Sequence, residues 1–154
     1  DYILNLQGDE PSIDENDIIN LNKLTINNNT EIGTLASKIT NKEIFINKNT
    51  VKVIAQEKLS YSNFPLALDF TRDDLSNSKE HIYHHIGIYS YKVKTLEKFV
   101  NLSQSKREIK NKLEQLRALD NDFKINVALA KKSPIGVDTK EDYLAIKKIM
   151  EYKS

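Results

Sequence analysis

Apolar residues recur along the chain in two spacings, one typical of strands and one typical of helices. Short apolar or alternating runs predict strands at 2–6, 32–39, 51–55, 85–93 and 124–130. Apolar residues three or four positions apart predict helices between several of these strands. Because strands and helices alternate along the chain, the pattern predicts an α/β layered sheet.

The helix ends carry recognisable capping residues. Asp14 or Asn16 can cap a first helix that the polar run 27–30 ends, with the apolar residues Ile18, Ile19, Leu21 and Leu24. A short helical turn is expected at 41–46. Ser105 and Glu108 form a capping box before one continuous helix with the apolar stripe Ile109, Leu113, Leu116 and Leu119. A final helix follows 136–139, with a buried face made of Tyr143, Ile146 and Met150.

The strand expected at 85–93 has two faces of different chemistry. Ile86 and Ile88 point to one face, which we expect to be core, while the other face carries His85, Gly87, Tyr89 and Tyr91. His85 and Tyr89 are about 13 Å apart in a regular strand. They either reach different ends of a ligand, or the strand bends at Gly87. Before this strand, 61–70 is expected to be a loose segment around Pro65, and 71–80 a polar mobile loop.

Composition limits the possible classes of protein. The 154 residues, 39% of them hydrophobic and 29% charged, suit a single domain with a real core. With 23 basic and 22 acidic residues, no overall field recruits nucleic acid or an anionic membrane surface. The absence of cysteine excludes disulfides and thiolate catalysis and is compatible with a cytoplasmic location. No apolar run reaches the length of a membrane span, so we expect no membrane insertion.

Two carboxylates stand where a metal-phosphate site is expected in such a sheet. Asp9 lies in a turn directly after the first strand, and open α/β sheets bind ligands at such strand ends. Asp138 precedes the last helix. Each has a plainer interpretation: Asp9 can close a turn, and Asp138 can cap the helix, although Thr139 offers an alternative cap. The three histidines at 81–85 have no neighbouring carboxylate pattern that would favour zinc.

Five motifs, in order along nearly the whole chain, carry a resemblance to a known family. They are QGDEP at 7–11, NTVKV at 49–53, HIGIYSY at 85–91, LEQLR at 113–117 and GVDTKED at 136–142. Together they resemble the 3-deoxy-manno-octulosonate (Kdo) cytidylyltransferases, the CMP-Kdo synthetases of Gram-negative bacteria. The resemblance implies transfer of CMP from CTP to Kdo, with release of pyrophosphate, for lipopolysaccharide biosynthesis. It also implies a homodimer and a Rossmann-like nucleotidyltransferase fold, a three-layer sandwich with a mixed sheet.

The same resemblance assigns roles to particular residues. Asp9 and Asp138 match the family's catalytic Mg²⁺ ligands, and five further residues match positions that contact Kdo, namely Gln7, His85, Tyr89, Glu114 and Gln115. Hard carboxylate oxygens suit Mg²⁺, and amide, hydroxyl and carboxylate groups suit sugar hydroxyls. The plainer alternatives are a satisfied buried imidazole for His85, sheet packing for Tyr89, and pairing of Glu114 with Arg117 or Lys110.

The chain also departs from the family pattern. The glycine-, arginine- and lysine-containing loop that grips CTP is not found, so 1–154 is expected to be one N-terminally incomplete domain, the C-terminal part of the enzyme, inactive alone. The segment 61–65 lacks the family's arginine, which Arg72 is the candidate to replace. The missing arginine leaves open a related acid sugar as substrate, such as 8-amino-Kdo or a sialic acid. A second alternative is that the chain is a non-catalytic dimerisation fragment.

Overall fold

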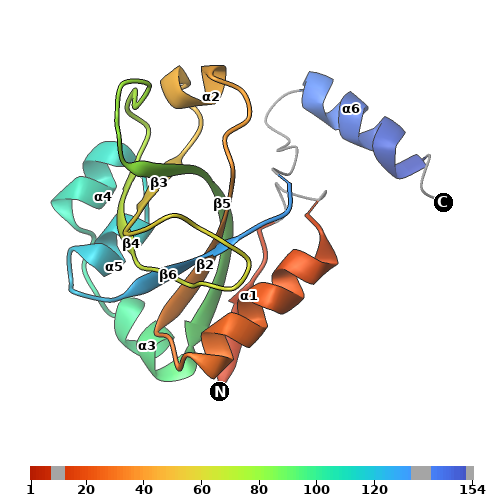
Figure 1. The fold of residues 1–154 in the computed structure, drawn as a ribbon. Coiled ribbons are helices and arrows are strands. Elements are labelled where there is room, and N and C mark those ends of the chain that lie inside the picture. The colour runs from red at the N-terminus through yellow and green to blue at the C-terminus, as the bar shows by residue number, and fades with distance from the viewer. Residues whose placement is uncertain (8–12, 133–139, 152–154) are drawn as a thin grey trace.

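The computed structural model describes residues 1–7, 13–132 and 140–151, which form a mixed sheet with helices on both faces (Figure 1). The strands are β1 (Tyr2–Asn5), β2 (Ile32–Ser37), β3 (Lys52–Ala55), β4 (Ala67–Thr71), β5 (His81–Lys92) and β6 (Ile125–Leu129). The helices are α1 (Glu15–Asn27), α2 (Glu43–Ile46), α3 (Val93–Phe99), α4 (Lys106–Asn111), α5 (Gln115–Leu119) and α6 (Lys140–Glu151).

The long strand β5 organises the sheet. The strand order is β4-β3-β5-β2-β6, and β1 also pairs with β5. Strands β2 and β6 run parallel, whereas β5 is antiparallel to β1, β2 and β3. The first four residues of β5 pair with β3 and its last four pair with β1, so two short strands meet one long one. The predicted mixed sheet is confirmed.

Strand β5 bends at Gly87. Thr34 of β2 is paired with Tyr89, but the next residue, Leu35, is paired with Ile86, so Gly87 and Ile88 form a bulge between these two pairs. A bulge bends its strand and increases the local twist. Of the two arrangements that the sequence allowed for His85 and Tyr89, the structure therefore has the bent strand.

Helices cover both faces of the sheet, which confirms the three-layer arrangement. Helix α1 covers one face, where Leu21 packs in a cluster with Leu35, Ile86, Ile88, Ala128 and Ala130. Helices α3, α4 and α5 lie on the opposite side in Figure 1, and Phe99, Leu113 and Leu116 pack there with Tyr89 and Tyr91. The face of β5 that carries Tyr89 and Tyr91 is thus a second core, which also contains His85, 6% exposed.

Both predicted helix caps are present, but the helix expected after Ser105 is interrupted. Asp14 caps α1, and Ser105 and Glu108 form a capping box on α4. The chain then leaves the helix at Lys112, which has left-handed backbone angles (φ 52°, ψ 48°), and resumes as α5. This break turns Leu113 and Leu116 into the core and leaves Ile109 61% exposed, so the single continuous stripe was wrong.

Other boundaries also differ from the sequence-based expectation. Residues 67–71, expected to be the end of a loose segment (61–70) and the start of a polar loop (71–80), form the edge strand β4, because pairing with β3 overrides the weak local pattern around Pro65. Strand β5 begins at His81, and the chain after Lys92 is helical. Tyr143 is 55% exposed, not buried as expected, while the side chains of Ile146 and Met150 lie outside what the structure describes.

A buried lysine joins the loops on either side of β3 and β4. The side chain of Lys52 is fully buried, and its Nζ donates to the carbonyls of Asn47 (3.0 Å) and Arg72 (2.9 Å). Arg72 in turn donates to the carbonyl of Asn49. Arg72 therefore holds a loop, and its role as a substitute for the missing family arginine stays a prediction. Among the described helices, none has the length and apolar character needed to cross a membrane.

Candidate functional site

Three of the predicted sugar-contacting residues gather at the bulge in β5. A side chain at Gly87 would bring its Cβ within 3.1 Å of the Gln7 Oε1 atom, so glycine allows the Gln7 amide to lie against the strand. His85 and Tyr89 flank Gly87 on the same face, and the bulge brings their ring centroids to 5.7 Å. Gln7 is exposed, whereas His85 and Tyr89 are buried.

His85 is neutral in this environment. Burial, followed by the charge of nearby His84, lowers the pKa of its imidazole to about 3. Phe70 packs edge-on against the ring, with centroids 4.9 Å apart. His85 therefore cannot act as a cation toward a sugar carboxylate near neutral pH. Its chemistry is that of a neutral imidazole, with one donor and one acceptor nitrogen.

The contacts of Thr34 favour one tautomer of the His85 imidazole. Its buried Oγ1 lies 3.0 Å from His85 Nε2, 2.8 Å from the Ile88 carbonyl and 3.3 Å from the Ile86 carbonyl. The hydroxyl has a single proton, and donation to the Ile88 carbonyl, the shortest of these three contacts, is the most favourable arrangement. The hydroxyl oxygen then accepts from a protonated Nε2. His85 Nδ1 is left as the acceptor nitrogen.

A row of rings leads from His85 to the helices on that face. Tyr89 stacks on Tyr91 with centroids 5.6 Å apart, and Tyr91 stacks on Phe99 at 6.2 Å. The guanidinium carbon of Arg117 lies 4.8 Å from the centre of the Phe99 ring, within cation–π range. This row connects the bulge in β5 to α5.

Glu114 and Gln115 lie at the far end of this row. Burial, followed by the charge of Glu114, raises the pKa of the Tyr91 hydroxyl, so Glu114 is close enough to Tyr91 to act on it. The Glu114 carboxylate is 65% exposed and accepts from Arg117 at 3.3 Å. Gln115 is 8% exposed. The pairing that the sequence offered as an alternative for Glu114 is therefore present, and its exposed carboxylate is still accessible to a ligand.

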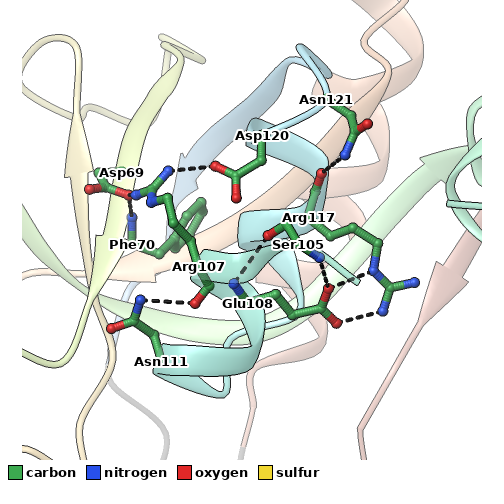
Figure 2. Close-up of polar contacts among 9 residues, drawn as sticks. All are labelled: Asp69, Phe70, Ser105, Arg107, Glu108, Asn111, Arg117, Asp120 and Asn121. Atoms are coloured by element: carbon green, nitrogen blue, oxygen red, sulfur yellow. Dashed lines mark hydrogen bonds and ion pairs between the residues drawn. The ribbon is translucent and has the colours of Figure 1, made fainter. Parts of the chain in front are cut away.

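Two arginines hold α4 and α5 in place (Figure 2). Arg117 makes two hydrogen bonds to Glu108, from Nε at 2.8 Å and from Nη2 at 2.6 Å. These bonds hold the pKa of the Glu108 carboxyl below its ordinary value. Arg107 bridges Asp69 of β4 and Asp120 at the end of α5. The short helix α5, which begins directly after Glu114, is thus fixed from both sides.

The two candidate metal ligands, Asp9 and Asp138, lie outside the described residues. The structure does describe two other aspartates, Asp14 and Asp17, at the start of α1. Asp14, which follows the segment 8–12, caps this helix. Asp17, 3% exposed, accepts from the backbone N–H of Lys131 at 3.0 Å, two residues before the segment 133–139 begins. Within the described ranges, no three His, Asp or Glu side chains are grouped to hold a metal ion.

Sequence reasoning missed Thr34, Phe70 and the positioning of Arg117. Thr34 gave no signal, because its role depends on a bulge in the neighbouring strand. Arg117 was visible within the 113–117 motif, but only as a surface partner for Glu114. Its burial, at 12% side-chain exposure, and its stronger partner Glu108 depend on the break at Lys112.

Comparison with protein families and curated sequences gives a consistent match. The family described as cytidylyltransferase matches residues 1–127. A 3-deoxy-manno-octulosonate cytidylyltransferase of Bartonella bacilliformis is 42% identical over 96% of this chain. The namesake enzyme of Thermodesulfovibrio yellowstonii is 43% identical over 91% of it. The chain spans about three fifths of these relatives, 60% and 56% of their respective lengths.

A solved structure supports the same relationship. It is that of CMP:2-keto-3-deoxy-manno-octonic acid synthetase in complex with CTP, with a TM-score of 0.86 and 26% identity. The match covers all of this chain and 63% of that one. The mixed sheet with helices on both faces is therefore the Rossmann-like, nucleotidyltransferase-type fold that the sequence motifs predicted.

Proposed function

Because this chain belongs to the cytidylyltransferase family, we propose that it supplies the sugar-binding and metal-binding part of a Kdo cytidylyltransferase. Such an enzyme transfers CMP from CTP to Kdo and releases pyrophosphate, which activates the sugar for lipopolysaccharide assembly. The observation that carries this proposal is the gathering of Gln7, His85 and Tyr89 around Gly87. The named relatives support the same substrate pair.

The three groups at the bulge suit recognition of hydroxyls. The Gln7 amide can both donate and accept, and the neutral His85 can accept through Nδ1. The exposed Glu114 carboxylate accepts from hydroxyl groups. Because His85 is neutral, the carboxylate of Kdo must be neutralised by another cation or by backbone N–H groups.

We propose that Asp9 and Asp138 hold Mg²⁺. Two carboxylates are the usual protein share of such a site, with phosphate and water oxygens completing the shell. When bound, the ion would neutralise the triphosphate and lower the pKa of the attacking hydroxyl. Described residues that border the two ligand-bearing segments meet at the start of α1, which supports this pairing. Asp14, the N-cap of α1, and Asp17, in its first turn, both contact Lys131.

We further propose that the CTP-binding loop precedes Asp1 and that the chain is inactive without this loop. We also propose that the enzyme is a cytoplasmic homodimer that binds no nucleic acid. We refer to this chain joined to that upstream segment as the extended protein. Isothermal titration with CTP and Mg²⁺ should show binding by the extended protein and none by the chain alone. Light scattering should give twice the mass of one chain. CTP binding by the chain alone would contradict the division proposed here.

Titration of the chain with Kdo tests the sugar site directly. In NMR spectra we expect Kdo to shift the Gln7 side-chain amide and the Gly87 backbone amide, which lie together at the bulge. Mannose, which lacks the carboxylate, is the control ligand. Shifts confined to residues far from β5, or none at saturating Kdo, would contradict the proposed sugar site.

Substitution of the carboxylates tests the metal site. In the extended protein, Asp9→Asn and Asp138→Asn should each abolish turnover with little change in melting temperature. Asp122→Asn is the matched control, because Asp122 is exposed and its left-handed backbone (φ 62°) suits Asn equally. If either of the first two variants retained activity, that aspartate would return to its turn-closing or helix-capping role.

One observation favours a related acid sugar as a second candidate substrate. Where the family has an arginine, the segment 61–65 offers Asn63, whose Nδ2 donates to the Lys58 carbonyl at 2.8 Å and whose Oδ1 accepts from Ser60 N at 2.7 Å. Asn63 therefore closes its own loop. Comparing kcat/KM for Kdo, 8-amino-Kdo and a sialic acid decides between these substrates, and we expect Kdo to be preferred.

A further inference from the structure

Arg117 stands between two carboxylates of very different exposure. Glu108 is 5% exposed and takes two hydrogen bonds from the guanidinium, whereas Glu114 is 65% exposed and takes one from Nη2. Arg117 itself is 12% exposed. One end of this arrangement is therefore part of the protein interior, and the other reaches solvent.

The buried end is fixed from several directions. The Glu108 carboxylate also accepts from Ser105 N at 3.1 Å, as part of the capping box of α4 (Figure 2). Gln104 Nε2 donates to the same carboxylate at 3.2 Å. The Phe99 ring lies against the guanidinium, 4.8 Å from its central carbon. A bidentate arginine held on an aromatic ring has little freedom to move. The Nη2 donor that reaches Glu114 is thus fixed in space.

Glu114 has no such support of its own. It precedes α5, makes no capping hydrogen bond there, and has Arg117 as its one recorded side-chain partner among the described residues. A long exposed side chain loses rotamer freedom when it binds a ligand, and that loss weakens binding. Holding one carboxylate oxygen in advance reduces this loss and leaves the other oxygen able to accept from a ligand hydroxyl.

On the basis of the function proposed above, we propose that Arg117 is a positioning residue for the sugar: it holds the Glu114 carboxylate in the orientation that accepts a Kdo hydroxyl. Arg117 does not touch the sugar itself. Its effect passes through Glu114, so it should affect sugar binding and not CTP binding or the chemical step. The Glu108 pair, in this view, is the fixed support from which Arg117 acts.

The test is a double-mutant cycle in the extended protein. Arg117→Lys keeps the charge but cannot bond Glu108 through two nitrogens while reaching Glu114. We expect Arg117→Lys and Glu114→Gln each to raise KM for Kdo about tenfold, the loss of one charge-assisted hydrogen bond. The double variant should be no weaker than Glu114→Gln alone. Both kcat and KM for CTP should change little.

Arg107→Lys is the matched control. Arg107 lies on α4 and also bridges two carboxylates, Asp69 and Asp120, but neither is a predicted sugar contact. We expect this variant to leave KM for Kdo unchanged. The positioning role would be overturned if the Arg117→Lys and Glu114→Gln effects simply multiplied, or if Arg117→Lys raised KM for CTP equally. A purely structural arginine would give either of those results.

A measurement on unsubstituted Arg117 covers the case in which Arg117→Lys fails to fold. Addition of Kdo should shift the Arg117 Nε–H signal in NMR spectra of the wild type and leave it in place in Glu114→Gln. An unmoved signal in a wild type that binds Kdo would refute the positioning role alone. A wild type that neither binds nor converts Kdo would refute the proposed function, and the role of Arg117 with it.

Discussion

Replacing Thr34 by valine tests the hydrogen-bond network that defines the bulge. Valine has the same shape but no hydroxyl, so the substitution removes contacts without creating a cavity. Thr34 is fully buried, and its Oγ1 lies within 3.0 Å of both His85 Nε2 and the Ile88 carbonyl. In Thr34→Val the buried Nε2–H loses its acceptor and the Ile88 carbonyl loses a donor.

The size of the effect follows from these two groups. A buried polar group left without a partner costs about 1 to 3 kcal/mol, so the pair should cost on the order of 3 kcal/mol. For a chain of this length that corresponds to a fall in melting temperature of roughly 6 to 12 °C. Thr25→Val is the matched control. Thr25 is equally buried, but its hydroxyl donates to the Leu21 carbonyl within α1, which the helix's own hydrogen bonds also satisfy.

Calorimetry and NMR together check this prediction. Scanning calorimetry should show a much larger loss for Thr34→Val than for Thr25→Val. Nitrogen-15 spectra of the His85 ring should show a protonated Nε2 in the wild type and a mixture of the two neutral tautomers in Thr34→Val. Equal losses in the two variants, or a wild-type ring protonated at Nδ1, would refute the assignment of Thr34 as the acceptor.

Two further predictions concern His85 and Gly87. The folded pKa of His85 is about 3, below its unfolded value, so its contribution to the free energy of unfolding is fully present above about pH 6.5. On acidification this contribution is lost by about 1.4 kcal/mol per pH unit, down to pH 3. In urea titrations, His85→Gln should flatten this decline between pH 6.5 and 4.5 and leave the weaker share of His84. Gly87→Ala should displace the Gln7 amide and weaken Kdo binding with little loss of stability. In Gly33→Ala the added Cβ would lie 2.4 Å from Thr25 Oγ1, so this variant should have a lower melting temperature. Melting curves and Kdo titration separate the two effects.

Local patterns predicted those parts of the fold that depend on local chemistry. Asp14 and the Ser105–Glu108 pair cap helices because their side chains bond backbone groups within three residues, which the sequence shows directly. The break at Lys112 was not predictable in this way. The stripe that continues through Leu113 is typical of one helix, and only packing against β5 decides that the chain turns first.

The same distinction holds for the candidate site. Family-like motifs identified Gln7, His85 and Tyr89, and the structure brings them together at the bulge. Their distance could not be predicted, because a regular strand separates His85 from Tyr89 by more than twice the observed 5.7 Å between rings. The neutral state of His85 likewise depends on burial by Phe70, a residue of a strand that the sequence did not reveal.

The most direct test of the proposed function is the reaction itself. Phosphorus-31 NMR of the extended protein with CTP, Kdo and Mg²⁺ should show CMP-Kdo and pyrophosphate forming in equal amounts, with no pyrophosphate when Kdo is omitted. The Gln7→Ala variant should need more Kdo for the same rate. Absence of both products in a folded, CTP-binding extended protein would contradict the assignment of this chain to Kdo activation.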